Sequence, residues 1–368
     1  MRVVRATHGL RPRLPFVGPP GLYWRAFRPA VPFVEVLDLH RCGLREGDYT
    51  AMRVLVTGAG GFIGSHLTRR IACEGDSVWA VTSPGESTGR LADVLDRVSV
   101  LAADLRDARA VQDVVCAVRP DCAVHLAWYL TPGKFWTAPE NLECVAMSLT
   151  LVEALARAGC KRLVGVGTCF EYDSDYGFLS ESITPCRPSS LYGVCKNATR
   201  EILQAYCRKA AMQFAWARIF HLYGPAEAEA RLVPAVILAL LNGQVAKCTH
   251  GEQIRDYLHV EDVASALWAI TKSEYCGAVN LGSGQPVKVR RIVETIAHYL
   301  EREKDVAFGA LPADPKESPL LVADVRKLAN EIGWKPALTL EEGVAKTCEW
   351  WRTRLPMLLA GDGAKGSA

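Results

Sequence analysis

The stretch Thr57-Gly-Ala-Gly-Gly-Phe-Ile-Gly64 decides the fold of this chain. It follows an apolar run at residues 53–57 that is typical of a buried strand, and residues 62–74 have the pattern of a helix. A glycine-rich turn between a strand and a helix predicts a dinucleotide-binding site, because the helix N-terminus presents unpaired N–H groups and a positive dipole end to phosphates. A tight turn without a ligand is the alternative interpretation.

Three glycines of this stretch have separate expected roles. Gly58 allows the tight turn, Gly61 lets a pyrophosphate approach the backbone, and Gly64 allows the helix to pack closely on the strand. The turn and the helix that follows it are therefore expected to hold the cofactor phosphates.

Short β-rich runs alternate with longer helical stretches along most of the chain. The expected strands are residues 53–57, 77–82, 98–101, 122–126, 161–167, 214–219 and 278–281. The expected helices lie near residues 62–74, 107–118, 140–158, 190–210, 233–242, 261–272 and 288–302. This alternation predicts an α/β fold: a Rossmann-type doubly wound parallel sheet with helices on both faces.

The chain is expected to divide into four parts. Residues 1–51 form an N-terminal extension, rich in Arg and Pro, that we expect to be poorly ordered and that lacks the apolar region of a secretory signal. Residues 52–220 form the dinucleotide-binding domain, with later returning segments, and residues 221–350 mainly form a smaller C-terminal substrate-binding lobe. Residues 351–368 form a tail. Met52 directly precedes the first strand, and we expect it to be the working start of translation.

Composition and charge exclude several classes of protein. The 368 residues are 49% hydrophobic and 23% charged, as in ordinary soluble globular proteins. Residues 1–51 hold eight Arg and four acidic residues, so the rest of the chain carries 35 basic and 36 acidic side chains and does not favour a nucleic-acid partner. Thirteen Cys without a C-x-x-C pair argue against a metal site and a disulfide framework, and favour the cytoplasm. No apolar run approaches the roughly 20 residues that span a membrane.

A second motif, Tyr192-Gly-Val-Cys-Lys196, indicates redox chemistry. A ketone that receives hydride needs a proton donor, and a free phenol with a pKa of about 10 is poorly matched to proton transfer at neutral pH. Lys196 lies one helical turn from Tyr192, and its charge, with that of an oxidised nicotinamide, favours the phenolate. Tyr192 is thus the expected general acid, and a surface Tyr/Lys pair is the alternative.

Two further segments lie between these motifs, His125-Leu-Ala-Trp128 and Thr168, each at the end of an apolar run. Together with the G-x-x-G-x-x-G spacing, they resemble the extended short-chain dehydrogenase/reductase family, the NAD-dependent sugar-nucleotide epimerases, dehydratases and ketoreductases. The resemblance covers roughly residues 52–350. It implies that Thr168 shares the substrate oxygen with Tyr192 and that Lys196 also holds the nicotinamide ribose.

The resemblance also implies the cofactor contacts. Asp104 and Leu105 match the pair that contacts adenine, although Asp104 can also cap the helix that follows. The expected cofactor-binding residues are Gly58, Gly61, Phe62, Ile63, Gly64, Thr82, Ser83, Asp104, Leu105, Leu126, Ala127, Trp128, Tyr192, Lys196 and Ile219.

The end of the second strand bears on the choice of cofactor. It reads Val81-Thr82-Ser83, about 18 residues past Gly64, where an NAD site usually places a carboxylate on the ribose hydroxyls. A missing acid removes repulsion of a 2′-phosphate, which Thr82, Ser83 and Arg90 could bind. The sequence therefore favours NADP, with NAD as the alternative.

The residues after Thr168 narrow the reaction. Dehydratases that resemble this chain place Asp-Glu directly after the Thr as acid and base for water elimination, whereas this chain reads Thr168-Cys-Phe-Glu-Tyr172. Glu171 stands three positions on and need not reach the same space. We therefore expect no dehydration, and we expect Cys169 and Phe170 to line the substrate pocket.

Segments further along match the substrate contacts of the family. His221 replaces the more usual Asn near the substrate diphosphate, although a structural His is the alternative. Arg255 is the strongest candidate for the diphosphate, because a guanidinium binds phosphate oxygens bidentately. The expected substrate residues are Cys169, Phe170, His221, Arg231, Leu232, Arg255 and, on the nucleotide ribose, Asp324.

The segment Trp128-Tyr-Leu-Thr-Pro-Gly-Lys-Phe-Trp136 is unusual for the family, in which many members have small residues here. Its bulky aromatic side chains either reshape the sugar pocket or pack on the second lobe. The sequence leaves both interpretations open.

The expected function is an NADP-dependent reduction of a nucleotide-linked 4-keto-6-deoxyhexose, with Tyr192 as general acid. A nucleotide-sugar 4-epimerase with retained NAD and a non-catalytic dinucleotide-binding protein are the alternatives. In the family that this chain resembles, the helices near 140–158 and 190–210 pair across a twofold axis as a four-helix bundle, so the resemblance implies a homodimer, and apolar positions on these helices could supply its surface. These positions are Leu149, Val152, Leu155, Ile202 and Leu203.

Overall fold

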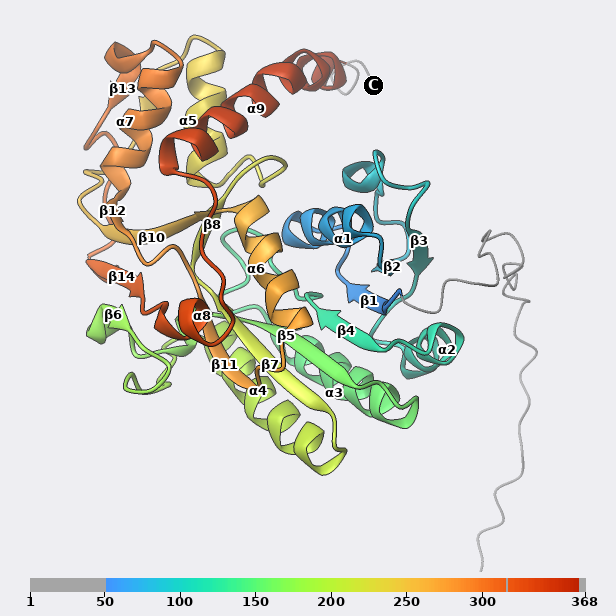
Figure 1. Ribbon diagram of the computed structural model, residues 1–368. Helices are drawn as coiled ribbons and strands as arrows, with labels where there is room; N and C mark the ends of the chain where they lie inside the picture. The colour runs from blue at the N-terminus through green and yellow to red at the C-terminus, as the bar shows by residue number, and fades with distance from the viewer. Residues whose placement is uncertain (1–50, 316, 364–368) are drawn as a thin grey trace, which may run out of the picture. The chain divides into compact units, whose positions relative to one another are not determined.

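A seven-stranded parallel sheet forms the centre of the computed structural model, which describes residues 51–315 and 317–363 (Figure 1). The strand order is β11 (Gly277–Leu281), β7 (Gln213–Ile219), β5 (Arg162–Thr168), β4 (Cys122–His125), β1 (Arg53–Thr57), β2 (Ser77–Thr82) and β3 (Ser99–Ala102). Every neighbouring pair is parallel. The predicted Rossmann-type sheet is confirmed, and each predicted strand lies within one residue of the observed bounds. The expectation for residues 1–50 lies outside the described residues.

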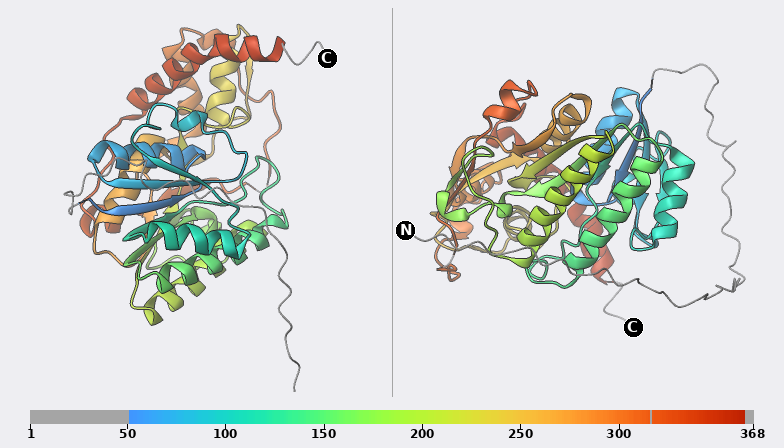
Figure 2. Two further views of the ribbon diagram at one scale, coloured as in Figure 1. Left: turned by 90° about the vertical axis from the view of Figure 1, so that its right-hand side faces the viewer. Right: turned by 90° about the horizontal axis from the view of Figure 1, so that it is seen from below.

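The helices cover both faces of this sheet (Figure 2). On one face α1 (Phe62–Glu74) packs against α6 (Val260–Lys272). On the other face α3 (Glu140–Arg157) packs between α2 (Ala108–Val118) and α4 (Leu191–Lys209).

Strand β1 shows why the sequence folds in this way. Val54 and Val56 point into the apolar core under α1 and α6, while Leu55 points into the core under α2, α3 and α4. All three side chains are fully buried. A strand that is apolar at every core position is therefore covered on both faces, as in the interior of parallel sheets.

The order of the strands places the candidate site. Starting from β1, the strands β2 and β3 follow one another toward one edge of the sheet. The strands β4, β5, β7 and β11 follow one another toward the opposite edge, and all strands stay parallel. Open α/β sheets bind ligands where the strand order reverses, outside the carboxyl ends of the strands. The reversal lies between β1 and β4.

A smaller mixed sheet lies in the C-terminal part of the chain. Its strands are β12 (Pro286–Lys288), β10 (Ile254–His259), β14 (Leu320–Ala323) and β6 (Phe178–Leu179), and β8 (His221–Tyr223) also pairs with β10. The helices α5 (Leu232–Leu241), α7 (Val289–Tyr299) and α9 (Leu340–Gly363) enclose a separate apolar core. The chain also contains the strand pair β9 (Ala246–Lys247) and β13 (Val306–Ala307), the short helix α8 (Arg326–Asn330) and several 3-10 helices of three residues each.

Three general features accompany this fold. None of the helices in the described part of the chain has the length and apolarity needed to cross a bilayer. Every described cysteine is a free thiol. Within the described residues, no group of three or more His, Cys, Asp or Glu is placed to hold a metal ion.

Candidate active site

The carboxyl ends of five parallel strands gather the predicted site residues at one edge of the sheet. Thr82 ends β2, Leu126 follows β4, Thr168 ends β5 and Ile219 ends β7. The fifth strand, β1, leads into the glycine-rich turn and α1, which begins at Phe62 and Ile63. Parallel strands thus bring residues that are far apart in sequence to a common edge.

The glycine-rich turn has the conformation that dinucleotide binding requires. Gly58 has a φ of 67°, a left-handed conformation that favours glycine. A Cβ atom at Gly64 would lie 2.1 Å from the carbonyl oxygen of Gly58, so only glycine lets α1 approach β1 this closely. Helix α1 has Gly61 as its N-cap without a side-chain hydrogen bond, and its first turn holds no acidic residue. The residues present therefore fit a diphosphate at this helix N-terminus.

A carboxylate lies at the end of β2 that sequence reasoning missed. Glu86 accepts a hydrogen bond from the backbone N–H of Ser83 (2.9 Å). Its carboxylate lies so close to Gly60 that a Cβ atom there would be 2.7 Å from Oε1. Glu86 follows Gly64 by 22 residues, and the acid that binds the ribose in dinucleotide sites lies about 20 residues past the glycines. That spacing was the available signal.

After β3, where the sequence predicts the adenine contacts, one capping prediction was wrong. Asp107, rather than Asp104, is the N-cap of α2 and accepts from the backbone N–H of Arg109 (2.8 Å). The Asp104 carboxylate pairs instead with Arg106 (2.8 Å), which lowers its pKa. Leu105 is buried beside it.

Thr168, Tyr192 and Lys196 come together where β5 meets α4. Ser190 caps α4 by accepting from the backbone N–H of Gly193 (3.2 Å), so Tyr192 lies in the first turn and Lys196 one turn later. Burial raises the pKa of the Tyr192 phenol, and a hydrogen bond with the Thr168 side chain works in the opposite direction.

Lys196 is buried and makes two close contacts. Its Nζ donates a hydrogen bond to the carbonyl oxygen of Val166 (2.8 Å) and lies 3.8 Å from the centre of the Trp128 ring. Burial lowers the pKa of Lys196 to about 7, although attraction to Glu171 opposes that shift. The amine therefore titrates near neutral pH.

Glu171 belongs to a buried network rather than to the substrate pocket. It ends the short helix η3 (Cys169–Glu171) and is fully buried. Its carboxylate accepts from the backbone N–H of Thr168 (2.9 Å), the indole N–H of Trp216 (2.9 Å) and Nε of Arg218 (2.7 Å). These partners occupy both oxygens of the carboxylate, in agreement with the expectation that Glu171 need not reach the space of the dehydratase acid and base.

His125 is a neutral structural residue between the sheet and α3. Its Nδ1 lies 2.7 Å from Oγ1 of Thr57, and its Nε2 lies 2.9 Å from Oγ of Ser148. Burial lowers the pKa of His125 to about 3. His125 is therefore uncharged and connects β1, β4 and α3 through its two hydrogen bonds. Two residues later, the backbone N–H of Ala127 donates to the same Thr57 hydroxyl (3.4 Å).

Three aromatic rings contact the Tyr192 ring, and a fourth packs on one of them. The ring centres of Phe135, Trp136 and Trp128 lie 5.0, 6.0 and 6.5 Å from that of Tyr192, all edge to face. Phe170 lies 4.7 Å from Trp136 in the same geometry. The aromatic segment thus lies against Tyr192, and its Phe135 ring also contacts Arg231 at the start of α5, so it has contacts of both kinds that the sequence left open.

The predicted diphosphate residues form a cationic group beside these rings. Burial, with repulsion from Arg255 and Arg231, lowers the pKa of His221 to about 3, so His221 is neutral and the two arginines carry the positive charge. The His221 ring centre lies 5.3 Å from that of Tyr257 and 6.0 Å from that of Phe170. Arg255 is buried and pairs with Glu317 (2.5 Å). Arg231, at the start of α5 next to Leu232, is exposed, and its guanidinium lies 5.5 Å from the ring centre of Phe135.

Asp324 forms an ion pair with a neighbouring arginine. Its carboxylate pairs with Arg326 (2.6 Å), and this pairing lowers the pKa of Asp324 to about 2. The side chain is buried. A role on the nucleotide ribose stays a prediction.

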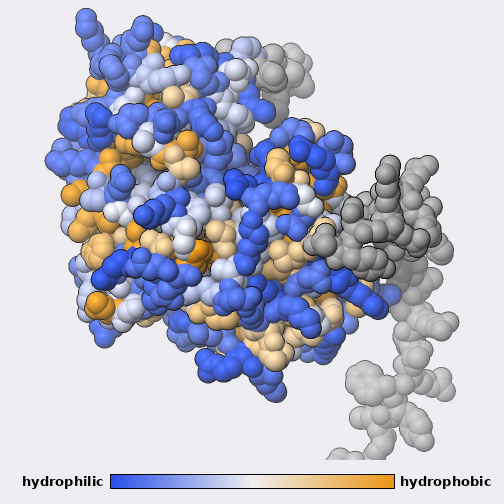
Figure 3. Space-filling model, in the orientation of Figure 1, coloured by the Kyte–Doolittle hydropathy of each residue, from blue (hydrophilic) through white to orange (hydrophobic). Residues whose placement is uncertain are grey.

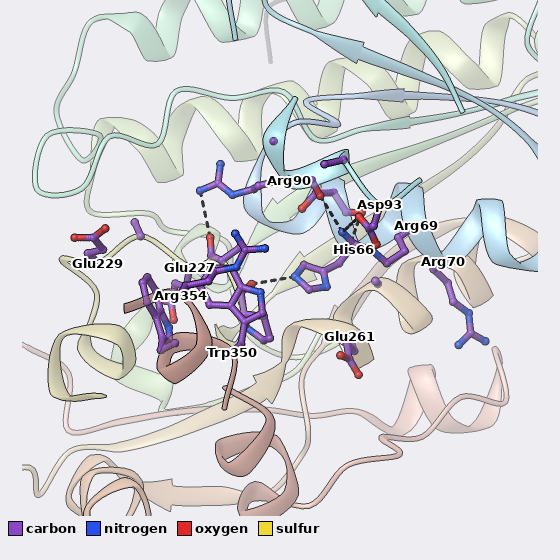
Figure 4. Close-up of a pocket in the computed structure, with 18 of the residues that line it drawn as sticks. His66, Arg69, Arg70, Arg90, Asp93, Glu227, Glu229, Glu261, Trp350 and Arg354 are labelled. Atoms are coloured by element: carbon purple, nitrogen blue, oxygen red, sulfur yellow. Dashed lines mark hydrogen bonds and ion pairs between the residues drawn. The ribbon is translucent and has the colours of Figure 1, made fainter. Parts of the chain in front are cut away.

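A cavity of about 930 Å³ lies along the outer face of α1 (Figure 4). His66 and Arg69 line it from α1, and Trp350 and Arg354 line it from α9. Arg90 reaches across it, donating to the carbonyl oxygens of Gly60 (3.4 Å) and Ala226 (3.2 Å). None of the three catalytic candidates lines this cavity.

Sequence comparison agrees with this geometry. The sequence profile of the NAD dependent epimerase/dehydratase family matches residues 54–282. The chain belongs to the NAD-dependent epimerase/dehydratase family. Its relatives are enzymes, so the enzyme prediction is confirmed and the non-catalytic alternative falls away.

Members of the NAD-dependent epimerase/dehydratase family with different activities resemble this chain equally well. It is 30% identical over 338 residues to the dTDP-glucose 4,6-dehydratase of Shigella flexneri, covering 82% of this chain and 92% of that protein. It is 30% identical over 322 residues to the UDP-glucose 4-epimerase of Mycolicibacterium smegmatis, covering 82% and 99%. The solved structure of the Thermus thermophilus UDP-glucose 4-epimerase in complex with NAD has a TM-score of 0.72 at 26% identity, covering 82% and 99%.

Proposed function

We propose that this family member reduces the 4-keto group of a nucleotide-linked sugar, with Tyr192 as the proton donor. The proposal rests on Cys169 and Glu171, the two side chains that could replace the acid and the base of a dehydratase. Burial raises the pKa of the Cys169 thiol to about 12, and the Glu171 carboxylate is held by Arg218. Tyr192 and Thr168 remain to serve the substrate oxygen, which suffices for hydride transfer but not for elimination of water.

A 4-epimerase is the second candidate, because 4-epimerases are among the relatives. An epimerase must return hydride to the opposite face of the sugar, so the keto sugar must turn over inside the site. The rings of Phe135, Trp136 and Phe170 crowd the space around Tyr192. This crowding favours a single sugar orientation and therefore a reductase.

The side chains divide the work of the reduction. When bound, a reduced nicotinamide supplies the hydride to the carbonyl carbon. Tyr192 donates its phenolic proton to the carbonyl oxygen, so the product is an alcohol, and the Thr168 hydroxyl orients the same oxygen. Lys196, as an ammonium, stabilises the phenolate that remains until solvent returns a proton. Burial of all three side chains strengthens these interactions.

For the cofactor we propose NAD rather than the NADP favoured by the end of β2. The Glu86 carboxylate beside Gly60 supports a pair of ribose hydroxyls and repels a 2′-phosphate. Glycine-turn residues would hold the diphosphate of the cofactor, and Lys196 the nicotinamide ribose. For the substrate diphosphate we propose Arg231, since the guanidinium of Arg255 is occupied by Glu317.

Incubation with a panel of nucleotide-linked 4-keto-6-deoxy sugars tests the proposal. We expect stoichiometric loss of NADH absorbance and a 4-hydroxy product for at least one substrate. Interconversion of nucleotide hexoses without net consumption of an added dinucleotide would identify a 4-epimerase instead. Release of water from a nucleotide hexose would identify a dehydratase.

A further inference from the structure

A single buried amide fixes the aromatic segment that surrounds Tyr192. Asn141 lies in the first turn of α3 and is fully buried. Its Oδ1 accepts a hydrogen bond from the indole N–H of Trp128 (2.9 Å). Its Nδ2 donates to the carbonyl oxygens of Phe135 (2.7 Å) and Ala138 (2.8 Å). The Asn141 amide therefore holds both ends of the segment, Trp128 and Phe135, through hydrogen bonds.

The hydrogen bond from Trp128 to Asn141 sets the direction in which the indole faces. With its N–H turned toward Asn141, the ring presents its face to Lys196, whose Nζ lies 3.8 Å from the ring centre. A second indole, that of Trp216, lies farther away at 5.9 Å. An ammonium over an indole face is attracted by the ring quadrupole, and the attraction is larger in a desolvated site.

We propose that Asn141 and Trp128 are positioning residues for the catalytic lysine: Asn141 orients the Trp128 indole, and the indole face holds the Lys196 ammonium beside Tyr192. Neither residue would touch the reacting atoms. Their effect would pass through Lys196, which the proposed function requires as a cation. The proposal adds Asn141 to the site and gives Trp128, which the sequence predicted only as a cofactor contact, a second role.

The other ionisable groups around Lys196 do not replace the indole. Glu171, from η3, attracts the ammonium, but its carboxylate is already bound by Arg218. Cys144, from α3, has a thiol pKa raised by burial and is therefore neutral, as is His125 from β4. Tyr192, on the same helix, is neutral because burial raises its pKa. No carboxylate in the described part of the chain forms an ion pair with Lys196.

The sign of the expected effect follows from this arrangement. Burial favours the neutral amine and lowers the pKa of Lys196 to about 7. The indole face favours the ammonium and so works against burial. Removing the indole should therefore lower the pKa of Lys196 further, by about one pH unit for a desolvated contact.

Competitive labelling with trace acetic anhydride tests this directly in the protein without cofactor or substrate. The acetylation of the peptide that contains Lys196 is measured by mass spectrometry across a pH series, and its midpoint gives the pKa. Because no turnover is involved, the result does not depend on the proposed reduction. We expect Trp128→Leu to lower the midpoint by about one pH unit and Trp128→Phe, which keeps an aromatic face, to lower it less.

Variants of Asn141 test whether it acts on Lys196 through the Trp128 indole. Asn141→Ala, or Asn141→Ser if the alanine variant does not fold, should lower the midpoint although Asn141 does not contact Lys196. In the Trp128→Leu background, the same change should add no further shift. Trp350→Leu, a half-buried indole on α9, is the matched control and should leave the midpoint unchanged. An unchanged midpoint in Trp128→Leu, or additive shifts in the double variant, would overturn the proposal.

Discussion

Burial favours the neutral form of Tyr192 and of Lys196, the two ionisable side chains for which we propose catalytic roles. It raises the pKa of Tyr192 and lowers that of Lys196 to about 7, so the phenol keeps its proton while the amine is close to losing one. A neutral phenol is the state that a proton donor needs. A cation beside it is the state that stabilises the phenolate formed during the reaction. The balance between the two depends on how well the site keeps the lysine charged.

The catalytic roles predict a definite order of losses. Tyr192→Phe should lower kcat by about 10²–10⁴-fold, because it removes the general acid, while dinucleotide binding changes little. Lys196→Ala should reduce both turnover and dinucleotide binding. Thr168→Val should be milder than Tyr192→Phe, since it removes one hydrogen bond. Steady-state kinetics and calorimetry of dinucleotide binding check the order, and a large loss in Thr168→Val with active Tyr192→Phe would contradict it.

Glu86 should control the choice between the two dinucleotides. Glu86→Ser removes the charge that opposes a 2′-phosphate, so kcat/KM for NADPH relative to NADH should rise on the order of tenfold, about 1.4 kcal/mol. Parallel assays with both cofactors measure the ratio. Asp96→Ser changes an exposed acid of the same β2–β3 connection and should leave the ratio as it is. A parent enzyme that already prefers NADPH would refute the role of Glu86.

The strand β10 ties the smaller sheet to the edge of the larger one. The carboxylate of Asp256 accepts from the backbone N–H of Ser283 (2.6 Å) and its hydroxyl (2.7 Å), and from the backbone N–H of Gly284 (2.9 Å) and Ala323 (3.2 Å). These donors belong to the turn after β11 and to β14. One buried acid thus joins three segments.

Loss of this carboxylate should destabilise the protein. Asp256→Ala leaves several buried N–H groups without an acceptor, so the free energy of unfolding should fall by about 3 kcal/mol. Urea unfolding followed by circular dichroism measures the change, and Asp256→Asn should fall between the parent and the alanine variant. Asp96→Ala, at an exposed position, is the control and should differ little from the parent. Equal stability of Asp256→Ala and the parent would contradict this reading of β10.

Elements of the larger sheet could be predicted because its strands are runs of four to seven residues that are rich in apolar side chains. The strands β6, β8, β9, β12 and β13 have only two or three residues each, too few for a period to show, so the helices α5 and α7 of the second lobe were predicted but its strands were not. In the candidate site, too, residues in local motifs could be predicted and contacts between distant segments could not. Local motifs identified Tyr192 and Lys196, whereas the ion pair of Glu171 with Arg218 spans 47 positions and depends on how β5 and β7 pair.

At the scale of the whole molecule, most of the residues predicted to form the homodimer interface are not available for it. Val152, Leu155 and Leu203 are buried within the chain and cannot supply a surface. Exposed apolar side chains do exist on α3 and α4, since Leu142 is 60% exposed and Ile202 45%. On the face drawn in Figure 3, apolar residues form patches interspersed with hydrophilic ones.

We expect α3 and α4 to form the dimer interface through these exposed residues. Ile202→Asp places a charge in that surface and should give the monomer mass, because an unpaired charge is costly to bury. Light scattering coupled to gel filtration at micromolar concentration measures the mass. Ile183→Asp changes an apolar side chain that is 73% exposed outside both helices, and it should leave the dimer intact. A parent protein of monomer mass would refute the prediction.

Arg90 joins two loops that would receive different ligands. One of its nitrogens binds the turn at Gly60, and another binds Ala226 in the loop that leads to Arg231. A ligand that fixes either loop therefore restricts the other through the same guanidinium. Thermodynamic linkage makes such an effect reciprocal. Occupancy by the dinucleotide would then change the affinity for the nucleotide sugar, and the nucleotide sugar would change the affinity for the dinucleotide by the same factor.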